Sequence, residues 1–166
     1  MSEQPALRVD EILGALTSAR VRFVIIGGIA AQVHGSPSLT GDVDICPDLD
    51  GQNLHRLALA LDALAAARRD MPDGVQPALD ERALRAGDVF TLTTRHGDLD
   101  LLGHPEPGLD YGRLVPGSPE VEILGVRVRV AGLDDLMAMK RAAGRPKDRI
   151  ELEILGAVRE EIDRQG

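Results

Sequence analysis

Two aspartates two residues apart are the most chemically suggestive feature of the sequence. Asp42 and Asp44 lie in the segment DVDIC, where Val43 and Ile45 are apolar. In a β-strand, residues two apart point to the same face, so both carboxylates would share one face. Two negative charges so close together repel each other unless a cation lies between them. The spacing therefore predicts a metal site, and the alternative is an exposed strand face with solvated acids.

A pair of glycines precedes these aspartates. Gly27 and Gly28 directly follow the apolar run RFVII, residues 22–26, which predicts a buried strand. Glycine lets a backbone approach another group closely, and the N-terminus of a helix suits anions. The segment IAAQVHG predicts a short helix here, closed by Gly35. We interpret the glycine pair either as part of a phosphate site or as a point of tight packing.

The rest of the chain supplies elements that would position these residues. Periodicity and composition predict helices over residues 7–19, 51–69, 78–85 and 134–142, and a last helix from about Lys147, with Pro146 near its first turn. Further strands are predicted at the segments VFTLTT, LDLL, VEIL and VRVRV, whereas the region 103–119, rich in proline and glycine, is predicted to be a surface loop. Short strands mixed with helices and joined by hairpin-length turns predict an α+β fold with a mixed sheet.

Composition limits the classes of function. The chain has 166 residues, which fits a single domain over residues 1–166, and 43% of them are apolar, enough for a core. Two Phe, one Tyr and no Trp argue against the aromatic stacking platforms of single-strand binders. A net charge of −8 argues against a protein that coats nucleic acid nonspecifically, because such binding depends on neutralising phosphates. The net charge does not exclude a nucleic-acid substrate that is held at one local patch.

The sequence also bears on the cellular compartment. Cys46 is the one cysteine, so neither an intrachain disulfide nor a thiolate zinc cluster can form. The N-terminus lacks the basic start and continuous apolar stretch of a signal peptide. No apolar run approaches the roughly 18 residues that a membrane span needs. We therefore expect a soluble cytoplasmic protein without a membrane partner.

The order of the motifs resembles a known superfamily. A strand, Gly-Gly, a helix ending in HG, a loop containing Thr40 and then D-x-D are similar to the DNA polymerase beta-like nucleotidyltransferases. Within them, the pattern looks most like the small prokaryotic AbiEii-type toxins and related nucleotidyltransferases. HGDLDLL resembles the strand that carries the third carboxylate of this group, and VRVRV through RIELEIL resembles its closing region. The resemblance covers about residues 20–155.

This resemblance implies a mixed-sheet fold flanked by helices and a two-metal site. The catalytic strands would lie within about residues 22–102, and a closing hairpin and helices within about 120–164. Asp42 and Asp44 would hold two Mg²⁺ (or Mn²⁺) ions against a nucleoside triphosphate. The nucleotide itself would be contacted by Gly27, Gly28, Thr40 and Lys140.

A third carboxylate is implied on the strand of HGDLDLL. Asp100 would complete the metal site and help to deprotonate the acceptor hydroxyl. Asp98 shares its strand face, so the choice between the two is not forced. We prefer Asp100 because Leu99 and Leu101 embed it in the strand, whereas Asp98 lies beside the turn.

The basic segment KRAAGRPKDR, residues 140–149, stands out in an acidic chain. By resemblance, Asp148 would support the site, and phosphates of the nucleotide or the acceptor would be contacted by Arg141, Arg145 and Lys147. The alternative is a charged helical surface, because basic residues near a helix C-terminus are favoured by the helix dipole. The family often has an arginine two residues before its threonine, and here Ser38 occupies that position. If such an arginine holds phosphates, this chain lacks it or supplies the charge elsewhere.

The resemblance implies an enzyme that transfers a nucleoside monophosphate from a nucleoside triphosphate to an acceptor hydroxyl. RNA, especially a tRNA 3′ end, is one acceptor, as for the toxin members, which would also imply an antitoxin partner. Small-molecule and protein side-chain acceptors stay open. The opposing hypothesis is a catalytically silent binding protein in a toxin–antitoxin pair. A third hypothesis is a mononucleotide-binding regulator. The three carboxylates favour the enzyme, and Ser38 favours the silent protein.

Overall fold

A mixed sheet of seven strands organises the computed structural model, which describes residues 4–72 and 74–166. The strand order is β3-β4-β5-β2-β1-β7-β6. In chain order the strands are β1 Phe23–Ile26, β2 Asp42–Pro47, β3 Ala67–Arg68, β4 Val89–Thr94, β5 Gly97–Leu102, β6 Glu120–Ile123 and β7 Val126–Val130. β2 pairs with β5 in parallel, as β1 does with β7, and the other neighbours pair antiparallel. The expected mixed sheet is confirmed.

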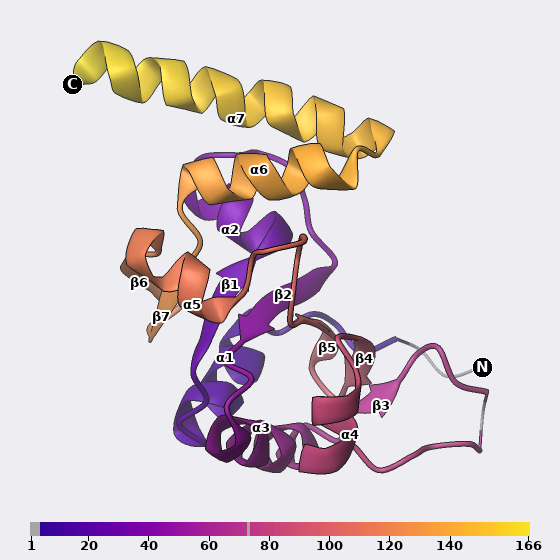
Figure 1. Ribbon diagram of the computed structural model, residues 1–166. Helices are drawn as coiled ribbons and strands as arrows, with labels where there is room; N and C mark the ends of the chain where they lie inside the picture. Colours follow the sequence, from indigo (N-terminus) through magenta and orange to yellow (C-terminus); the bar gives the residue numbers. More distant parts are fainter. Residues whose placement is uncertain (1–3, 73) are drawn as a thin grey trace.

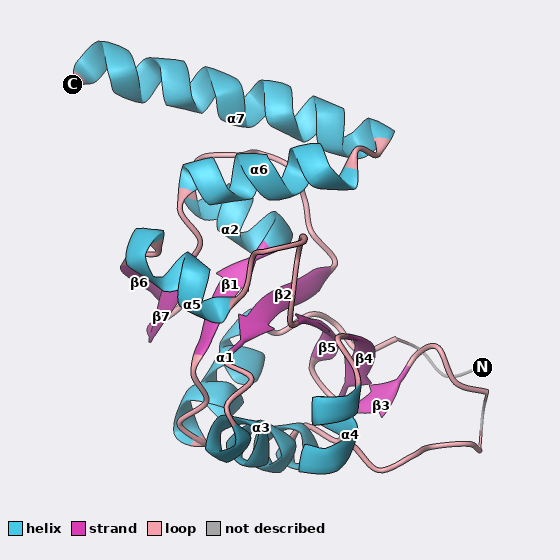
Figure 2. Ribbon diagram, in the orientation of Figure 1, coloured by secondary structure: helices cyan, strands magenta, loops and turns pink. Residues whose placement is uncertain are grey.

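Apart from the short α5 (Tyr111–Leu114), the helices gather in two groups around this sheet (Figure 1). In chain order they are α1 Val9–Ser18, α2 Gly27–Val33, α3 Gly51–Ala63, α4 Glu81–Ala86, α5 Tyr111–Leu114, α6 Leu133–Ala143 and α7 Pro146–Gln165, with a 3₁₀ turn, η1, at Val115–Gly117. α1 contacts α3, which contacts α4, below the sheet in this view. α2 lies against β1 and β2, α6 packs on α2, and α7 packs on α6 (Figure 2). α2, α6 and α7 therefore form a helical layer on one side of the sheet.

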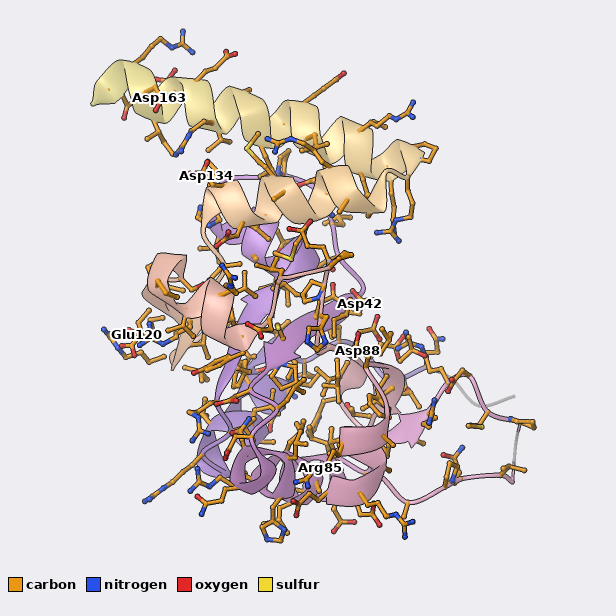
Figure 3. The ribbon with its side chains drawn as sticks, viewed as in Figure 1. Asp42, Arg85, Asp88, Glu120, Asp134 and Asp163 are labelled. Atoms are coloured by element: carbon orange, nitrogen blue, oxygen red, sulfur yellow. The ribbon has the colours of Figure 1, made fainter. Side chains whose placement is uncertain are left out.

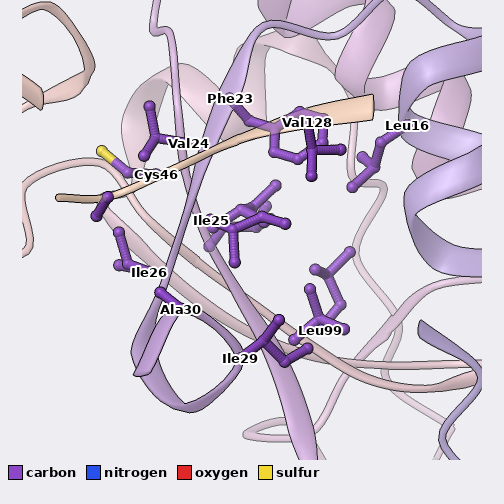
Figure 4. Close-up of a cluster of buried hydrophobic side chains, with 14 of the residues drawn as sticks. Leu16, Phe23, Val24, Ile25, Ile26, Ile29, Ala30, Cys46, Leu99 and Val128 are labelled. Atoms are coloured by element: carbon purple, nitrogen blue, oxygen red, sulfur yellow. The ribbon is translucent and has the colours of Figure 1, made fainter. Parts of the chain in front are cut away.

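The core is built from aliphatic side chains, as the shortage of aromatics requires. All four residues of β1 are buried, and Ile25 lies at the centre of the cluster together with Leu99 of β5 and Val128 of β7 (Figure 4). On β2, Val43 and Ile45 are fully buried, while Asp42 and Asp44, which alternate with them, are half-buried. This alternation follows the two-residue period of a strand. Burial of the apolar residues therefore fixes the opposite orientation of the two aspartates.

The helix expected over residues 51–69 is shorter than its composition suggests. α3 ends at Ala63, and Ala65 takes a left-handed backbone with φ of 53°. The next residues, Ala67 and Arg68, form the edge strand β3 against β4. Pairing with an open sheet edge here overrides the helix propensity of an alanine- and arginine-rich run. The change moves Arg69 from a predicted helix end to the margin of the sheet.

The region 103–119 is also more ordered than the surface loop expected for it. It contains α5 and η1, and it buries Leu109 and Leu114 in the core. The other elements are confirmed within a few residues, including the β4–β5 and β6–β7 hairpins. α6 is followed by Gly144, with φ of 64°, and Pro146 opens α7. Among the described helices, none is long and apolar enough to cross a membrane.

Candidate metal and nucleotide site

Parallel pairing of β2 with β5 brings three aspartates together. Asp44 lies opposite Asp100 in the register, and Asp42 lies opposite Asp98. One carboxylate oxygen from each of Asp42, Asp44 and Asp100 lies within 4.8 Å of the other two. Asp42 projects from the start of β2 (Figure 3). The structure thus places Asp100, and not Asp98, in a cluster with the D-x-D pair.

The electrostatics of this cluster favour a cation. Burial raises the pKa of Asp44 to about 7, and the neighbouring charges of Asp42 and Asp100 add to the rise. Burial also raises the pKa of Asp100, although Arg69 opposes that rise. Carboxyl groups this close cannot all ionise without a counter-charge. Three carboxylates are hard oxygen donors, so the residues fit a Mg²⁺ or Mn²⁺ ion.

Arg69 is a member of the site that sequence reasoning missed. Its Nη2 lies 2.8 Å from Oδ1 of Asp100, and its Nη1 lies 3.4 Å from Oδ2 of Asp98. Nη1 also donates a hydrogen bond of 2.6 Å to the carbonyl oxygen of Leu92, which fixes the guanidinium. The acidic pairs on two strands could have suggested a cation nearby. Which residue supplies that cation depends on the early end of α3, and the sequence does not reveal where α3 ends.

The glycine pair packs against the aspartate strand. Gly27 begins α2 with φ of 70°, and a side chain there would overlap the carboxylate of Asp44. A Cβ on Gly28 would lie 2.7 Å from Oγ1 of Thr40. Thr40 in turn donates to the backbone oxygen of Asp42 at 3.2 Å. Close packing is therefore a sufficient physical reason for both glycines, and it places the start of α2 beside the carboxylates.

The residues that face the aspartate cluster belong to the junction of α6 and α7. Asp148 is fully buried, and its Oδ2 accepts hydrogen bonds from Nε and the backbone N–H of Arg145 at 2.7 and 3.1 Å. Nζ of Lys140 lies 3.4 Å from its other oxygen. Burial alone would raise the pKa of Asp148, but the bonds from Arg145 outweigh it and hold that pKa below its ordinary value. Asp148 thus joins the two helices and orients both cations.

A cavity of about 510 Å³ separates the acidic strands from this basic junction. It is lined by residues of β1, β2, β4 and β5, the loop before β2, and helices α2, α6 and α7. Its volume lies within the range of small-molecule sites, about 300–1,000 Å³. The two walls carry opposite charges, so the cavity suits a metal-bound anion.

Solved structures share this architecture. The lincosamide antibiotic adenylyltransferase LnuA, bound to lincomycin, is 14% identical over 92% of this chain and 99% of its own, with a TM-score of 0.60. A proposed nucleotidyltransferase of Thermotoga maritima, TM1012, is 15% identical over 96% and 97%, with a TM-score of 0.57. ANT(2″)-Ia in complex with adenylyl-2″-tobramycin is 16% identical over 95% of each chain, with a TM-score of 0.55. The chain has the nucleotidyltransferase fold. No protein-family model and no curated protein sequence matches it.

Within this nucleotidyltransferase fold, the cavity gathers the residues singled out from the sequence, with one exception. Arg141 is exposed on α6 and is not part of the lining, whereas Lys147, also exposed, is. Two further lining residues that were not predicted as ligand contacts hydrogen-bond to each other. They are Ser38, which hydrogen-bonds to α7, and Glu151, which receives that bond. Their proximity depends on how α7 docks, for which the sequence carries no local signal.

Proposed function

We propose that this protein is a metal-dependent nucleotidyltransferase that moves a nucleoside monophosphate from a nucleoside triphosphate to an acceptor hydroxyl. The observation that carries the proposal is the cluster of Asp42, Asp44 and Asp100, whose oxygens lie within 4.8 Å of one another in the wall of a cavity. The raised pKa of Asp44 supports it, because ionising this carboxyl group without a counter-charge is unfavourable. The shared fold supports it further.

The three aspartates would hold Mg²⁺ or Mn²⁺, and we propose two ions, as the motif resemblance implies. Bound there, the ions would neutralise phosphate charge and stabilise the attacking and leaving oxygens. The acceptor oxygen bonds to the α-phosphorus while the bond from that phosphorus to its bridging oxygen breaks, and pyrophosphate leaves with the electron pair. Asp100 would accept the proton of the acceptor hydroxyl, because it lies on β5, whereas the glycine pair packs against Asp44 and Thr40.

The remaining site residues bind and orient the triphosphate. Lys140 is the best-placed cation, because its contact with Asp148 at 3.4 Å is long and leaves it able to turn toward phosphate. The backbone at Gly27 and Gly28 lies beside Asp44 and would approach the same phosphates, with Thr40 orienting Asp42. Arg145 is held by Asp148 and contributes mainly positive potential.

Two classes of acceptor have support. A small organic molecule is favoured by the size of the cavity and by the lincomycin and adenylyl-tobramycin bound to proteins of the same fold. RNA is favoured by the exposed cations Arg141 and Lys147 and by the AbiEii-type resemblance, which would also imply a cytoplasmic toxin with an antitoxin partner. A silent binding protein with this fold would bind nucleotide without transfer, and Ser38 is the residue that favours it.

The test is a transfer assay with each of the four nucleoside triphosphates, labelled at the α-phosphate, and Mg²⁺ or Mn²⁺. Total RNA is the acceptor in one arm, and a panel of lincosamides and aminoglycosides is the acceptor in the other. We expect label to pass to one acceptor class, with release of pyrophosphate, and the Asp44→Asn variant to transfer none. Nucleotide binding without transfer in every arm would indicate the silent protein instead.

A further inference from the structure

Two acidic side chains one turn apart on α7 have opposite surroundings. Asp148 is fully buried and lies against two cations, Arg145 and Lys140. Glu151 is 8% exposed, and no cation lies within ion-pair distance of it among the described residues. A buried acidic group without a cationic partner is costly. Two cations offset this cost for Asp148, whereas no cation of the described residues offsets it for Glu151.

The carboxyl group of Glu151 is only half satisfied. Its Oε2 accepts a hydrogen bond of 2.9 Å from Oγ of Ser38. Its Oε1 is buried and has no hydrogen-bond partner among the residues that the structure describes. Buried polar atoms in native proteins nearly always have a partner, so an orphaned oxygen needs an explanation. A bound hydrogen-bond donor would satisfy this oxygen.

Glu151 and its hydrogen-bond partner belong to the wall of the large cavity. Ser38 and Glu151 both line it, as do their sequence neighbours Leu39 and Ile150, which are 97% and 62% exposed. The Ser38 loop is held in place, because Nε2 of Gln32 donates to its carbonyl oxygen at 2.9 Å and its N–H donates to Oγ of Ser36 at 3.2 Å. A fixed loop therefore holds the hydroxyl of Ser38 against Glu151 of α7, at a cavity that Leu39 and Ile150 also line.

We propose that Ser38 and Glu151 form a subsite for an amino or ammonium group of an organic ligand. A carboxyl oxygen without a partner calls for a hydrogen-bond donor, and a nitrogen-centred donor also supplies favourable charge or dipole. A divalent cation fits poorly, because the two side chains offer too few oxygens for a site that prefers about six. Leu39 and Ile150 suit the carbon skeleton that carries the nitrogen.

This subsite deepens the proposed function, since the nitrogen could belong either to the nucleobase or to the acceptor. Both sources share one chemistry, and two arms of one binding experiment separate them. In the first arm, calorimetry measures cyclohexylamine against cyclohexanol, which has a similar ring but no amine. In the second arm, it measures Mg–ATP against Mg–ITP, whose base carries an oxygen in place of the exocyclic amino group. The variants are Glu151→Met and Ser38→Arg, and the control is Glu153→Met, an exposed glutamate of the same helix.

We expect the wild-type protein to prefer the amino-bearing member of at least one pair by about 10-fold or more, the effect of one charge-assisted hydrogen bond. Glu151→Met should abolish that preference, and so should Ser38→Arg, which introduces a permanent cation beside Glu151. Glu153→Met should retain it. A preference lost only in the ATP–ITP pair assigns the subsite to the base, and one lost only in the amine pair assigns it to the acceptor.

Thermal unfolding separates a ligand subsite from a structural role. Glu151→Met removes a half-satisfied buried carboxyl, so the Tm should stay unchanged or rise. A marked fall in Tm with Glu151→Met would make Glu151 an anchor of the Ser38 loop and would overturn the proposal. So would equal binding of both members of each pair by the wild-type protein. Amine binding needs no transfer and should survive Asp44→Asn, so failure of the proposed transferase activity would not be mistaken for failure of the subsite.

Discussion

The two walls of the cavity both carry charged side chains, but the fold compensates those charges differently. On the helical wall, Asp148 is buried between Arg145 and Lys140, so its charge is compensated within the fold. On the strand wall, Asp42 and Asp44 face Asp100 with Arg69 as partner of Asp100 alone among the three. Around Asp148, the helical wall has the signature of a structural network. The strand wall has the signature of a site that needs a bound cation.

This difference shows why charge composition alone misleads. The basic segment of residues 140–149 is conspicuous in the sequence, yet part of its charge serves to dock α7 on α6. The aspartates of the strand wall are separated in the sequence, and they form a cluster only because β2 and β5 pair side by side. Function is therefore best sought where charges remain uncompensated.

The largest expected effect is loss of chemistry on the strand wall. Asp42→Asn and Asp44→Asn should each impair both Mg–nucleotide binding and transfer. Asp100→Asn should keep much of the nucleotide affinity while transfer falls by about 10²–10⁴, the usual cost of a lost general base. Asp98→Asn, outside the cluster, is the matched control and should be nearly silent. Calorimetry with a non-hydrolysable nucleotide beside the transfer assay measures both, and a dead Asp98→Asn with an active Asp100→Asn would reverse the two roles.

The next effect concerns the glycine that packs under Asp44. Gly27→Ala places a methyl group against that carboxylate and forces alanine into a left-handed backbone, which alone costs about 1–2 kcal/mol. We expect a clear fall in the free energy of unfolding and weaker metal binding. Gly14→Ala, at a helical position with open space around it, is the control and should not destabilise. Urea unfolding of both variants tests this, and equal stability would remove the packing explanation.

Arg69 should control how strongly the strand wall attracts metal. It neutralises part of the charge on Asp98 and Asp100, so Arg69→Met should tighten Mn²⁺ binding several-fold. It should also destabilise the metal-free protein, because the carboxylates lose their counter-charge. Arg68→Met, the neighbouring arginine paired with Asp70, is the control. Unchanged Mn²⁺ affinity in Arg69→Met would place Arg69 outside the site.

The stability of the metal-free protein should depend on pH through Asp44. Its pKa of about 7 when folded lies above the ordinary 3.8. Between these values the folded state keeps a proton that the unfolded chain has released, so stability falls as the pH rises from about 4 to about 7. We expect a change of a few degrees in Tm, weakened in Asp44→Asn and by saturating Mg²⁺. A Tm profile identical in wild type and Asp44→Asn would contradict the assignment.

The smallest effect should come from two exposed cations of the basic segment, Arg141 and Lys147. Replacing Arg141 and Lys147 with glutamine should leave metal and nucleotide binding nearly unchanged. If RNA is the acceptor, the double variant should bind it more weakly and with a flatter salt dependence. A salt titration of RNA binding decides the point. Equal loss of nucleotide affinity would assign these cations to the nucleotide, and no loss of either kind would make them solvated surface.

Much of the fold could be predicted because local patterns determine it. The apolar run of β1 and the alternation in β2 specify buried strands, and Gly144 and Pro146 mark the break between α6 and α7. The early end of α3 could not be predicted, because an open edge of β4 overrides the local propensity of residues 64–69. The contacts of Arg69, Ser38 and Glu151 could not be predicted either, because they depend on long-range packing. Each acquires its chemistry from a partner more than 20 residues away in the chain.

The central claim is that Asp42, Asp44 and Asp100 hold a divalent cation in this cavity. Electron paramagnetic resonance of free Mn²⁺ during titration with the protein tests it most directly, because it counts bound ions without relying on transfer. We predict saturable binding by the wild-type protein and by Asp98→Asn, strong weakening in Asp44→Asn, and tighter binding when a nucleoside triphosphate is added. Equal binding by wild type and Asp44→Asn, or none by the wild type with nucleotide present, would contradict the account.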